Sequence, residues 1–182
     1  MIIKSWIYVP VLILFSASLV TCQNNQVQNS DVVNTPTTEK LQENVYKAEN
    51  EGWLVNVEEA YQISQKTGRP ILANFTGSDW CGWCKRLTAS VFIKDEFKKW
   101  AAENVVLLEL DFPRKKTIPA EIQQQNAGMQ QAFQVRGYPT IWVFNLDKDA
   151  ATNQFQVKAL GSTGYKATPE EFIADVNNMI KK

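Results

Sequence analysis

The chain has 182 residues, enough for one domain of ordinary size plus a targeting segment. Its 19 basic and 19 acidic residues balance, so net charge does not indicate a nucleic-acid-binding protein. The sequence contains no histidine, which excludes a hydrolase that pairs a serine or cysteine with a histidine base.

Residues 1–21 have the three-part pattern of a secretory signal peptide. Lys4 supplies a positive charge, residues 6–15 are continuously apolar, and residues 16–21 are small and weakly polar. The apolar run is short for a transmembrane span, and an uncleaved membrane anchor is the alternative. Both interpretations predict an exported protein, on the periplasmic face of a bacterial membrane or soluble in the periplasm.

Cys22 lies where a signal peptidase would cut. Together with Leu19, Val20 and Thr21 it resembles a bacterial lipobox, whose cysteine becomes acylated, although Thr21 departs from the usual Gly, Ala or Ser. The acyl chains would anchor the protein in the membrane, since each buried methylene contributes about 0.8 kcal/mol. The alternative is that Cys22 is an incidental part of the signal. Residues 22–44 are polar and lack aromatic residues, which predicts a flexible tether.

Residues 45–182 are predicted to form the folded domain, beginning with a short apolar run at Trp53–Val55. Apolar residues at helical spacing then predict a helix from Val57, with Asn56 as its N-cap and Gly68 at its end.

Strands and helices alternate through the rest of the domain. The apolar patterns predict strands at residues 71–75, 105–110, 140–144 and 154–160, and helices after Cys84, from Pro119 and from Thr168, with an interruption of the first at residues 91–93. The order β-α-β-α-β-α-β-β-α is typical of an α/β fold with helices on both faces of a central sheet. The basic segment at residues 114–116 is interpreted as a solvated loop tip, with partner docking as the alternative.

Cys81 and Cys84 form a C-x-x-C pair, which occurs in zinc sites, structural disulfides and redox centres. Zinc needs four ligands, and the domain has no further cysteine and no histidine. A disulfide that closes so small a loop removes little chain entropy and stabilises poorly. Redox exchange is therefore the favoured interpretation, and no metal or other cofactor is expected.

The two cysteines are expected to play different roles. Cys81 follows a buried strand and begins a helix, where unpaired N–H groups and the helix dipole favour the thiolate. Cys84 lies one turn later and would face inward. Cys81 is therefore predicted to be the nucleophile, and Cys84 to resolve the mixed disulfide. Trp83 lies between them and is expected to be an exposed apolar contact for substrates.

Three segments together resemble the thioredoxin superfamily: Ile71–Phe75, Asp79–Lys85 and Val135–Thr140. The segment Gly-Ser-Asp-Trp-Cys-x-x-Cys is similar to that of exported bacterial members, the thiol:disulfide interchange proteins. The resemblance covers about residues 50–182. It implies a thioredoxin-like three-layer sandwich with a mixed central sheet.

The resemblance also implies a set of substrate-binding residues. Pro139 would be cis, and its loop would lie against the cysteines. Tyr138 would offer its backbone N–H and C=O to an extended substrate. Trp80 resembles the tryptophan beside the active site in this family, with a simple core role as the alternative.

The sequence departs from the family at one position. Asn74 occupies the place of a buried aspartate that is thought to take the proton of the resolving cysteine, and an amide cannot act as that base. The proton of Cys84 would then pass to water or to another carboxylate, Glu109 or Asp111.

These features predict an exported thiol-disulfide oxidoreductase that reduces disulfides of other exported proteins and is recharged by a membrane thiol carrier. The segment between the cysteines lacks the histidine of strongly oxidising relatives, which favours the reducing direction. A disulfide isomerase and a redox-silent binding module are the alternatives, and a Cu(I) carrier is a third.

Overall fold

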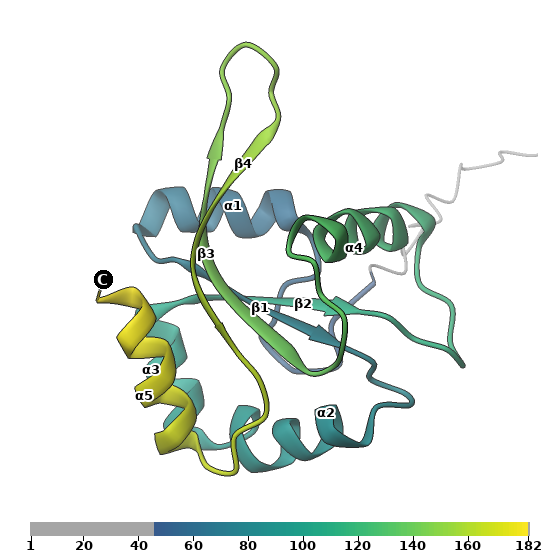
Figure 1. The fold of residues 1–182 in the computed structure, drawn as a ribbon, viewed down its shortest axis with the longest axis vertical. Helices are drawn as coiled ribbons and strands as arrows, with labels where there is room; N and C mark the ends of the chain where they lie inside the picture. Colours follow the sequence, from purple (N-terminus) through teal and green to yellow (C-terminus); the bar gives the residue numbers. More distant parts are fainter. Residues whose placement is uncertain (1–45, 182) are drawn as a thin grey trace, which may run out of the picture. The chain divides into compact units, whose positions relative to one another are not determined.

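The computed structural model describes residues 46–181 (Figure 1). The predicted signal peptide, the lipidation site Cys22 and the predicted tether lie outside the described residues. Within residues 46–181, none of the helices is both long and apolar enough to cross a bilayer.

A mixed four-stranded sheet forms the middle layer, with the strand order β2-β1-β3-β4. The central strand β1 (Ile71–Thr76) pairs in parallel with β2 (Val106–Asp111) and antiparallel with β3 (Thr140–Lys148). The last strand, β4 (Phe155–Thr163), pairs antiparallel with β3. All six residues of β1 are buried, because both faces of the sheet are covered.

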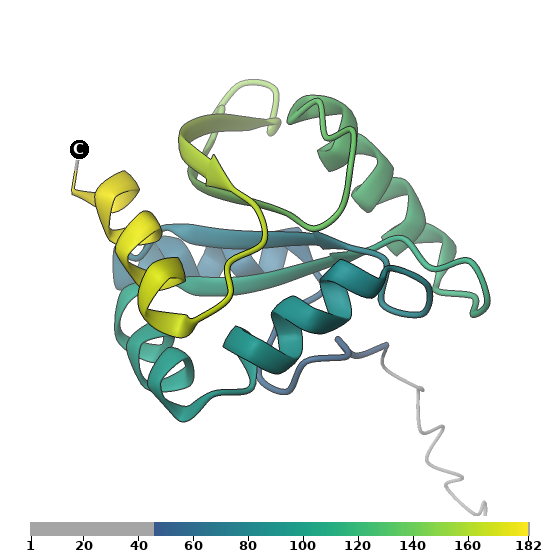
Figure 2. The same ribbon diagram turned by 60° about the horizontal axis from the view of Figure 1, so that its bottom comes forward.

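Helices cover the two faces of the sheet, as predicted (Figures 1 and 2). They are α1 (Val57–Thr67), α2 (Gly82–Leu87) with the π-helical turn η1 (Thr88–Phe92), α3 (Asp95–Asn104), α4 (Ala120–Ala132) and α5 (Pro169–Ile180). Side chains of α2, η1, α3 and α5 pack on one face, and those of α1 and the end of α4 pack on the other. The predicted three-layer α/β sandwich is confirmed.

Alternation along β1 divides the core into two clusters, one on each face. Leu72 points toward α2, α3 and α5, where it packs with Phe92, Phe97 and Phe172. Ile71, Ala73 and Phe75 point to the opposite face, toward α1 and the end of α4. Asn74 and Thr76 therefore lie on the face that carries α2 and the cysteines.

The helix ends agree with the capping signals. The side chain of Asn56 accepts a hydrogen bond from the N–H of Glu59 (3.1 Å) at the start of α1. Gly68 ends that helix with a left-handed φ of 70°, and its N–H donates to the carbonyl of Ser64 (2.8 Å). A break in the helix after the cysteines is also present, but it lies at residues 93–94, because η1 continues to Phe92 and α3 begins at Asp95, so the predicted interruption at residues 91–93 was placed slightly too early.

The expected first strand is much shorter than predicted. Only Leu54 makes strand-like contacts: its N–H donates to Leu107, and its carbonyl accepts from Glu109 on β2. The chain leaves the sheet edge at once because Asn56 already caps α1. The sheet therefore has four strands and an isolated bridge instead of five strands.

The last two strands extend further than predicted. The strand β3 continues to Lys148, and β4 runs from Phe155 to Thr163. The turn that we expected at residues 147–153 therefore lies at residues 149–154. Two interactions account for this difference. Asp147 forms an ion pair with Lys158 on the opposite strand, and the Asp149 carboxylate accepts N–H bonds from Ala151 (3.0 Å) and Thr152 (2.8 Å).

Candidate functional site

Cys81 and Cys84 lie where the central strand β1 passes into α2. Cys81 is the N-cap of α2, and its Sγ accepts a hydrogen bond from the N–H of Cys84 (3.1 Å). The two residues are joined by a disulfide, with Cα atoms 5.3 Å apart. Both are buried, with 5% of Cys81 and 4% of Cys84 exposed, so residue burial alone does not distinguish them.

A cavity of about 290 Å³ distinguishes the two cysteines, because Cys84 lines it and Cys81 does not. Its other walls include Thr76 at the end of β1 and Glu109 on β2. Glu109 has only 1% of its surface exposed, and this burial raises the pKa of its carboxyl above the ordinary value. Cys84 and a buried carboxyl group that holds its proton more tightly than usual therefore share one cavity.

Hydrogen bonds from the segment before α1 hold the Glu109 carboxylate in place. Oε1 accepts from the N–H of Glu49 (2.8 Å), and Oε2 accepts from Nδ2 of Asn50 (2.7 Å). These bonds favour the ionised form and oppose the larger effect of burial. Glu109 is the register partner of Asn74, whose buried Oδ1 has no hydrogen-bond partner among the described residues.

Asp111, the other carboxylate considered from the sequence, has a different set of contacts. It accepts hydrogen bonds from the N–H (2.8 Å) and the Oγ (2.6 Å) of Ser78, and it forms an ion pair with Lys116 (3.0 Å). Asp111 thus fixes the turn before Cys81, while Glu109 lines the cavity beside Cys84.

Asp79 anchors the loop between β2 and α4 to the cysteine segment. Its carboxylate accepts N–H bonds from Arg114 (3.0 Å), Lys115 (2.6 Å) and Lys116 (3.1 Å). Desolvation opposes ionisation, yet these bonds outweigh it and hold the pKa of Asp79 below its usual value. The basic segment at residues 114–116 is therefore part of the site region, which its sequence did not indicate.

Trp80 connects the cysteine segment with two other loops. Its indole Nε1 donates to the carbonyl of Phe112 (2.8 Å), and its ring makes an edge-to-face contact with Tyr138 (centroids 5.7 Å apart). The guanidinium of Arg114 lies over the indole, 3.7 Å from the ring centroid. Trp80 is thus central to the site region.

The Tyr138–Pro139 peptide bond is cis. Tyr138 is half-buried between Trp80 and Phe112, and its hydroxyl accepts a hydrogen bond from Gln130 on α4 (2.6 Å). The structure thereby brings the loop of Tyr138 and Pro139 into contact with the segment that carries the cysteines, through Trp80.

Trp83, between the two cysteines, is 54% exposed. It makes an edge contact with Tyr165 (5.0 Å between centroids), and the guanidinium of Arg86 lies 4.7 Å from its ring. Tyr165 follows β4 and was not singled out in the sequence, because nothing in the local pattern at residue 165 indicates contact with residue 83.

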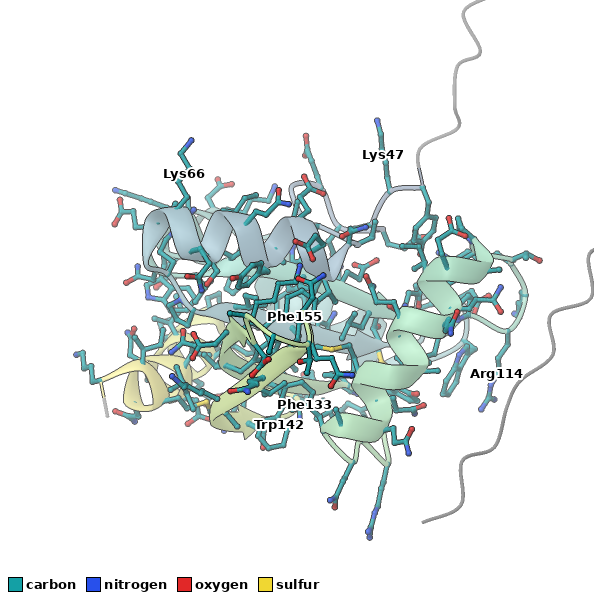
Figure 3. All side chains as sticks on the ribbon, turned by 90° about the horizontal axis from the view of Figure 1, so that it is seen from above. Lys47, Lys66, Arg114, Phe133, Trp142 and Phe155 are labelled. Atoms are coloured by element: carbon teal, nitrogen blue, oxygen red, sulfur yellow. A yellow bond between two sulfur atoms is a disulfide. The ribbon has the colours of Figure 1, made fainter. Side chains whose placement is uncertain are left out.

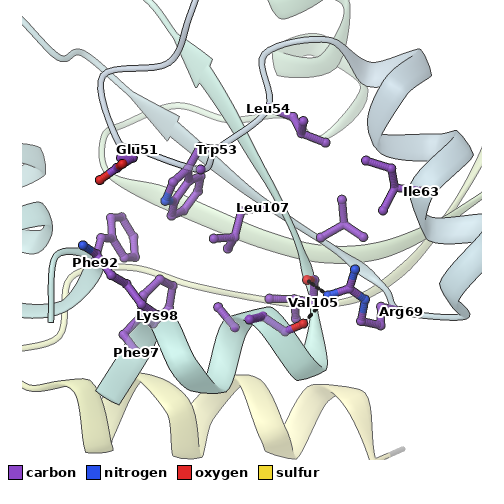
Figure 4. Close-up of a pocket in the computed structure, with 14 residues that line it drawn as sticks. Glu51, Trp53, Leu54, Ile63, Arg69, Phe92, Phe97, Lys98, Val105 and Leu107 are labelled. Atoms are coloured by element: carbon purple, nitrogen blue, oxygen red, sulfur yellow. Dashed lines mark hydrogen bonds between the residues drawn. The ribbon is translucent and has the colours of Figure 1, made fainter. Parts of the chain in front are cut away.

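A second cavity, lined largely by apolar residues, lies away from the cysteines. It has a volume of about 360 Å³ and lies between the segment before α1, α3 and β2, with Trp53, Phe97 and Leu107 among its walls (Figure 4). None of the cysteine-site residues lines it. Within residues 46–181, no group of three or more Cys, Asp or Glu side chains is placed to hold a metal ion.

The fold and the cysteine pair define a thioredoxin-like protein. Residues 57–177 match the model of the thioredoxin-like domain, and the chain belongs to that family.

Within this family, the chain is similar to the disulfide bond reductase DsbH of Chlamydia pneumoniae, with 36% identity over 83 residues. It is also 30% identical over 87 residues to the thioredoxin-related protein DsbJ of the same organism. These matches cover 46% and 48% of this chain, and 50% and 25% of the two relatives, so the chain spans half of their length or less. A solved structure of a DsbH oxidoreductase is 26% identical, with a TM-score of 0.60, covering 76% of this chain and 94% of that one.

Proposed function

We propose that this protein is a thiol-disulfide oxidoreductase that reduces disulfides of other exported proteins through Cys81 and Cys84. The observation that carries the proposal is the Cys81–Cys84 disulfide at the start of α2, next to the aromatic residues Trp80, Trp83 and Tyr138. The name of the relative DsbH, a disulfide bond reductase, supports the reducing direction.

The reaction begins with both cysteines reduced. The Cys81 thiolate attacks one sulfur of the substrate disulfide, forms a mixed disulfide and releases the other sulfur as a thiolate, which takes up a proton. The Cys84 thiolate then attacks Cys81 Sγ, which forms the Cys81–Cys84 disulfide and releases the second substrate thiolate. Two electrons and two protons pass to the substrate, and the protein ends in the disulfide-bonded form.

We assign to Glu109 the proton that Cys84 must lose before it attacks. Its carboxyl group lines the same cavity as Cys84, and its raised pKa makes it a better base than an ordinary carboxylate. Asn74, in the neighbouring strand, cannot accept this proton.

In this proposal, the aromatic residues hold the substrate. Trp83 presents an exposed apolar face beside Cys81, and the backbone of Tyr138 before cis-Pro139 pairs with the substrate chain as an added strand. Trp80 holds these two regions in a fixed relation through its contacts with Tyr138 and Phe112.

We further propose that the protein is exported, that Cys22 is acylated to attach it to the membrane, and that a membrane thiol carrier returns electrons to Cys81 and Cys84. The signal pattern of residues 1–21 and the lipobox-like segment before Cys22 support the first two points. Labelling with a radioactive fatty acid tests the anchor: incorporation that survives Cys22→Ala would refute it.

The reduction potential of the cysteine couple, measured in glutathione buffers, tests the direction of electron flow. A reductase requires a potential near that of thioredoxin, about −270 mV, whereas a value near −120 mV would identify an oxidant. Trapping with Cys84→Ser tests the exchange itself, because this variant cannot resolve a mixed disulfide. Capture of no substrate by Cys84→Ser, with Cys81→Ser as the matched control, would instead favour a redox-silent binding module.

A further inference from the structure

The segments that frame the cysteine pair differ from the rest of the domain in charge. Contacts of Trp80, Trp83 and Ser90 join four segments around the pair, residues 76–90, 112–118, 134–140 and 163–167. Together they contain seven basic residues and a single acidic residue, Asp79. Glu49, Glu109 and Asp111 from adjoining segments also lie at the site, which makes seven basic and four acidic residues there, against 17 basic and 16 acidic in residues 46–182 as a whole.

Most of this positive charge has no acidic partner within the described residues. Lys116 pairs with Asp111 and Glu49, and Lys166 pairs with Asp175. The carboxylate of Asp79, the single acidic group of these segments, is occupied by the N–H groups of residues 114–116. The five basic side chains left over are all exposed: Lys85, Arg86, Arg114, Lys115 and Arg136.

Two of these cations have defined positions, over the tryptophans that precede and follow Cys81 in the sequence. Arg114 lies over the ring of Trp80, the residue before Cys81, at 3.7 Å. Arg86 lies over the ring of Trp83, between the cysteines, at 4.7 Å. Each guanidinium uses one face for the indole and keeps its N–H groups free to bind carboxylates. Asp79 further restricts Arg114 by holding its backbone.

We propose that this cationic frame selects disulfides flanked by acidic residues, so that the partner is a protein segment with Asp or Glu close to its disulfide. The two placed guanidiniums stack on Trp83 and Trp80, the tryptophans that follow and precede Cys81 in the sequence, so we expect a segment that exchanges with Cys81 to pass near both. The inference rests on the proposed function and names the substrates that the site prefers.

The experiment compares three peptides with the same internal disulfide, flanked by Glu, Gln or Lys. The dithiothreitol-reduced protein, freed of excess reductant, is mixed with each peptide, and reduced peptide is quantified after alkylation. At low ionic strength, we expect the Glu peptide to react about ten-fold faster than the Lys peptide. This ratio should fall toward one as the salt concentration approaches 1 M, because these charges are exposed.

Charge variants locate the effect. We expect the double variant Arg86→Gln, Arg114→Gln to lower the Glu/Lys ratio to about two-fold or three-fold, while Arg114→Lys keeps most of it. The matched control removes two exposed charges elsewhere, with Lys66→Gln and Lys181→Gln, and should leave the ratio unchanged. Figure 3 shows Lys66 and Arg114 at opposite ends of the domain.

The ratio also excludes a simpler effect of the cations. Arg86 and Arg114 could raise the reactivity of the Cys81 thiolate, but that would accelerate all three peptides equally and leave the ratio unchanged. Equal rates for the three peptides at low salt would overturn the proposed selectivity and leave the reductase function standing. Failure to reduce any peptide would overturn both.

Discussion

Asn74 and Glu109 are register partners on the adjacent parallel strands β1 and β2, and both side chains are buried. The amide of Asn74 therefore has a carboxyl group beside it, one strand away. Glu109 lines the cavity that Cys84 also lines, so this carboxyl group lies on the same side of the sheet as Cys84.

The first prediction concerns the pH dependence of stability. Burial raises the pKa of Glu109 in the folded protein, so the folded state binds this proton more tightly than the unfolded state. The resulting contribution to the free energy of unfolding is complete below the unfolded pKa of about 4.5. That contribution is lost as pH rises through the higher folded pKa. Glu109→Gln removes the titration, so the stability of wild type relative to this variant should fall as pH rises above about 4.5. The slope cannot exceed about 1.4 kcal/mol per pH unit.

Urea unfolding at several pH values measures this difference. The titrations of all other groups are common to both proteins and cancel. A difference that stays constant or grows with pH would show that burial does not raise the pKa of Glu109.

The second prediction concerns the resolving step. In Glu109→Gln, Cys84 loses its proton acceptor, and we expect the mixed disulfide on Cys81 to persist about ten-fold longer at pH 6 to 7. The effect should shrink as pH rises, because hydroxide then removes the thiol proton without an acceptor from the protein. Acid quenching followed by mass spectrometry measures the lifetime. A purely structural role would lengthen it equally at every pH.

The third prediction concerns the anchored loop. Asp79→Ala removes the acceptor of three N–H groups, and we expect amide hydrogens of residues 114–116 to exchange several-fold faster. Asp149→Ala is the matched control, because Asp149 also accepts backbone N–H bonds, in a hairpin turn outside the site. It should accelerate exchange at residues 151 and 152 and leave residues 114–116 unaffected. Unchanged exchange at residues 114–116 in Asp79→Ala would contradict the anchoring role.

The pKa of Asp79 adds a pH condition to this prediction. Although desolvation opposes ionisation, hydrogen bonds hold the folded pKa below the usual 3.8. The anchor is therefore complete above that value and is lost as pH falls through the folded pKa. The loop of wild type should resemble that of Asp79→Ala only in strong acid.

The fourth prediction uses the close approach of Gly77 and Trp80. A Cβ at residue 77 would lie 2.4 Å from Cε2 of the indole, so Gly77→Ala must displace the ring. We expect the unfolding free energy to fall by about 1–3 kcal/mol and the hydrogen bond from the Trp80 indole to the Phe112 carbonyl to be lost. Gly128→Ala in α4 is the control, because its Cβ meets nothing within 4 Å, and it should stabilise the helix by about 0.5–1 kcal/mol. Equal stabilities of the two variants would contradict the packing argument.

Local patterns predicted much of the fold because local interactions determine it. The Asn56 cap, the Gly68 end and the apolar run at residues 71–75 can each be recognised within a few residues. The short first strand is reduced to a single bridged residue, because an apolar run of three residues does not reveal how many of its backbone groups find a partner. At Leu54, only one residue does.

The site could be predicted only in part. The spacing of Cys81 and Cys84 identified the reactive pair, but the surroundings depend on pairs of residues far apart in sequence. The bonds of Asp79 to residues 114–116 and the contact of Trp83 with Tyr165 arise from chain topology. Arg114 and Lys115 are exposed, as expected of a solvated loop tip, whereas Lys116 is partly buried and pairs with Asp111 and Glu49. The attachment of this segment through its backbone leaves no sequence pattern.

The way Asp79 holds this loop has a consequence for evolution and engineering. The carboxylate binds peptide N–H groups, which every residue except proline possesses, so the anchor does not depend on the side chain of Lys115. The side chains of Arg114 and Lys116 have further contacts with Trp80, Asp111 and Glu49, whereas new side chains can be installed at residue 115 without loss of the loop position. The loop is thus a ready location for rewriting the substrate preference of the enzyme while its cysteines remain untouched.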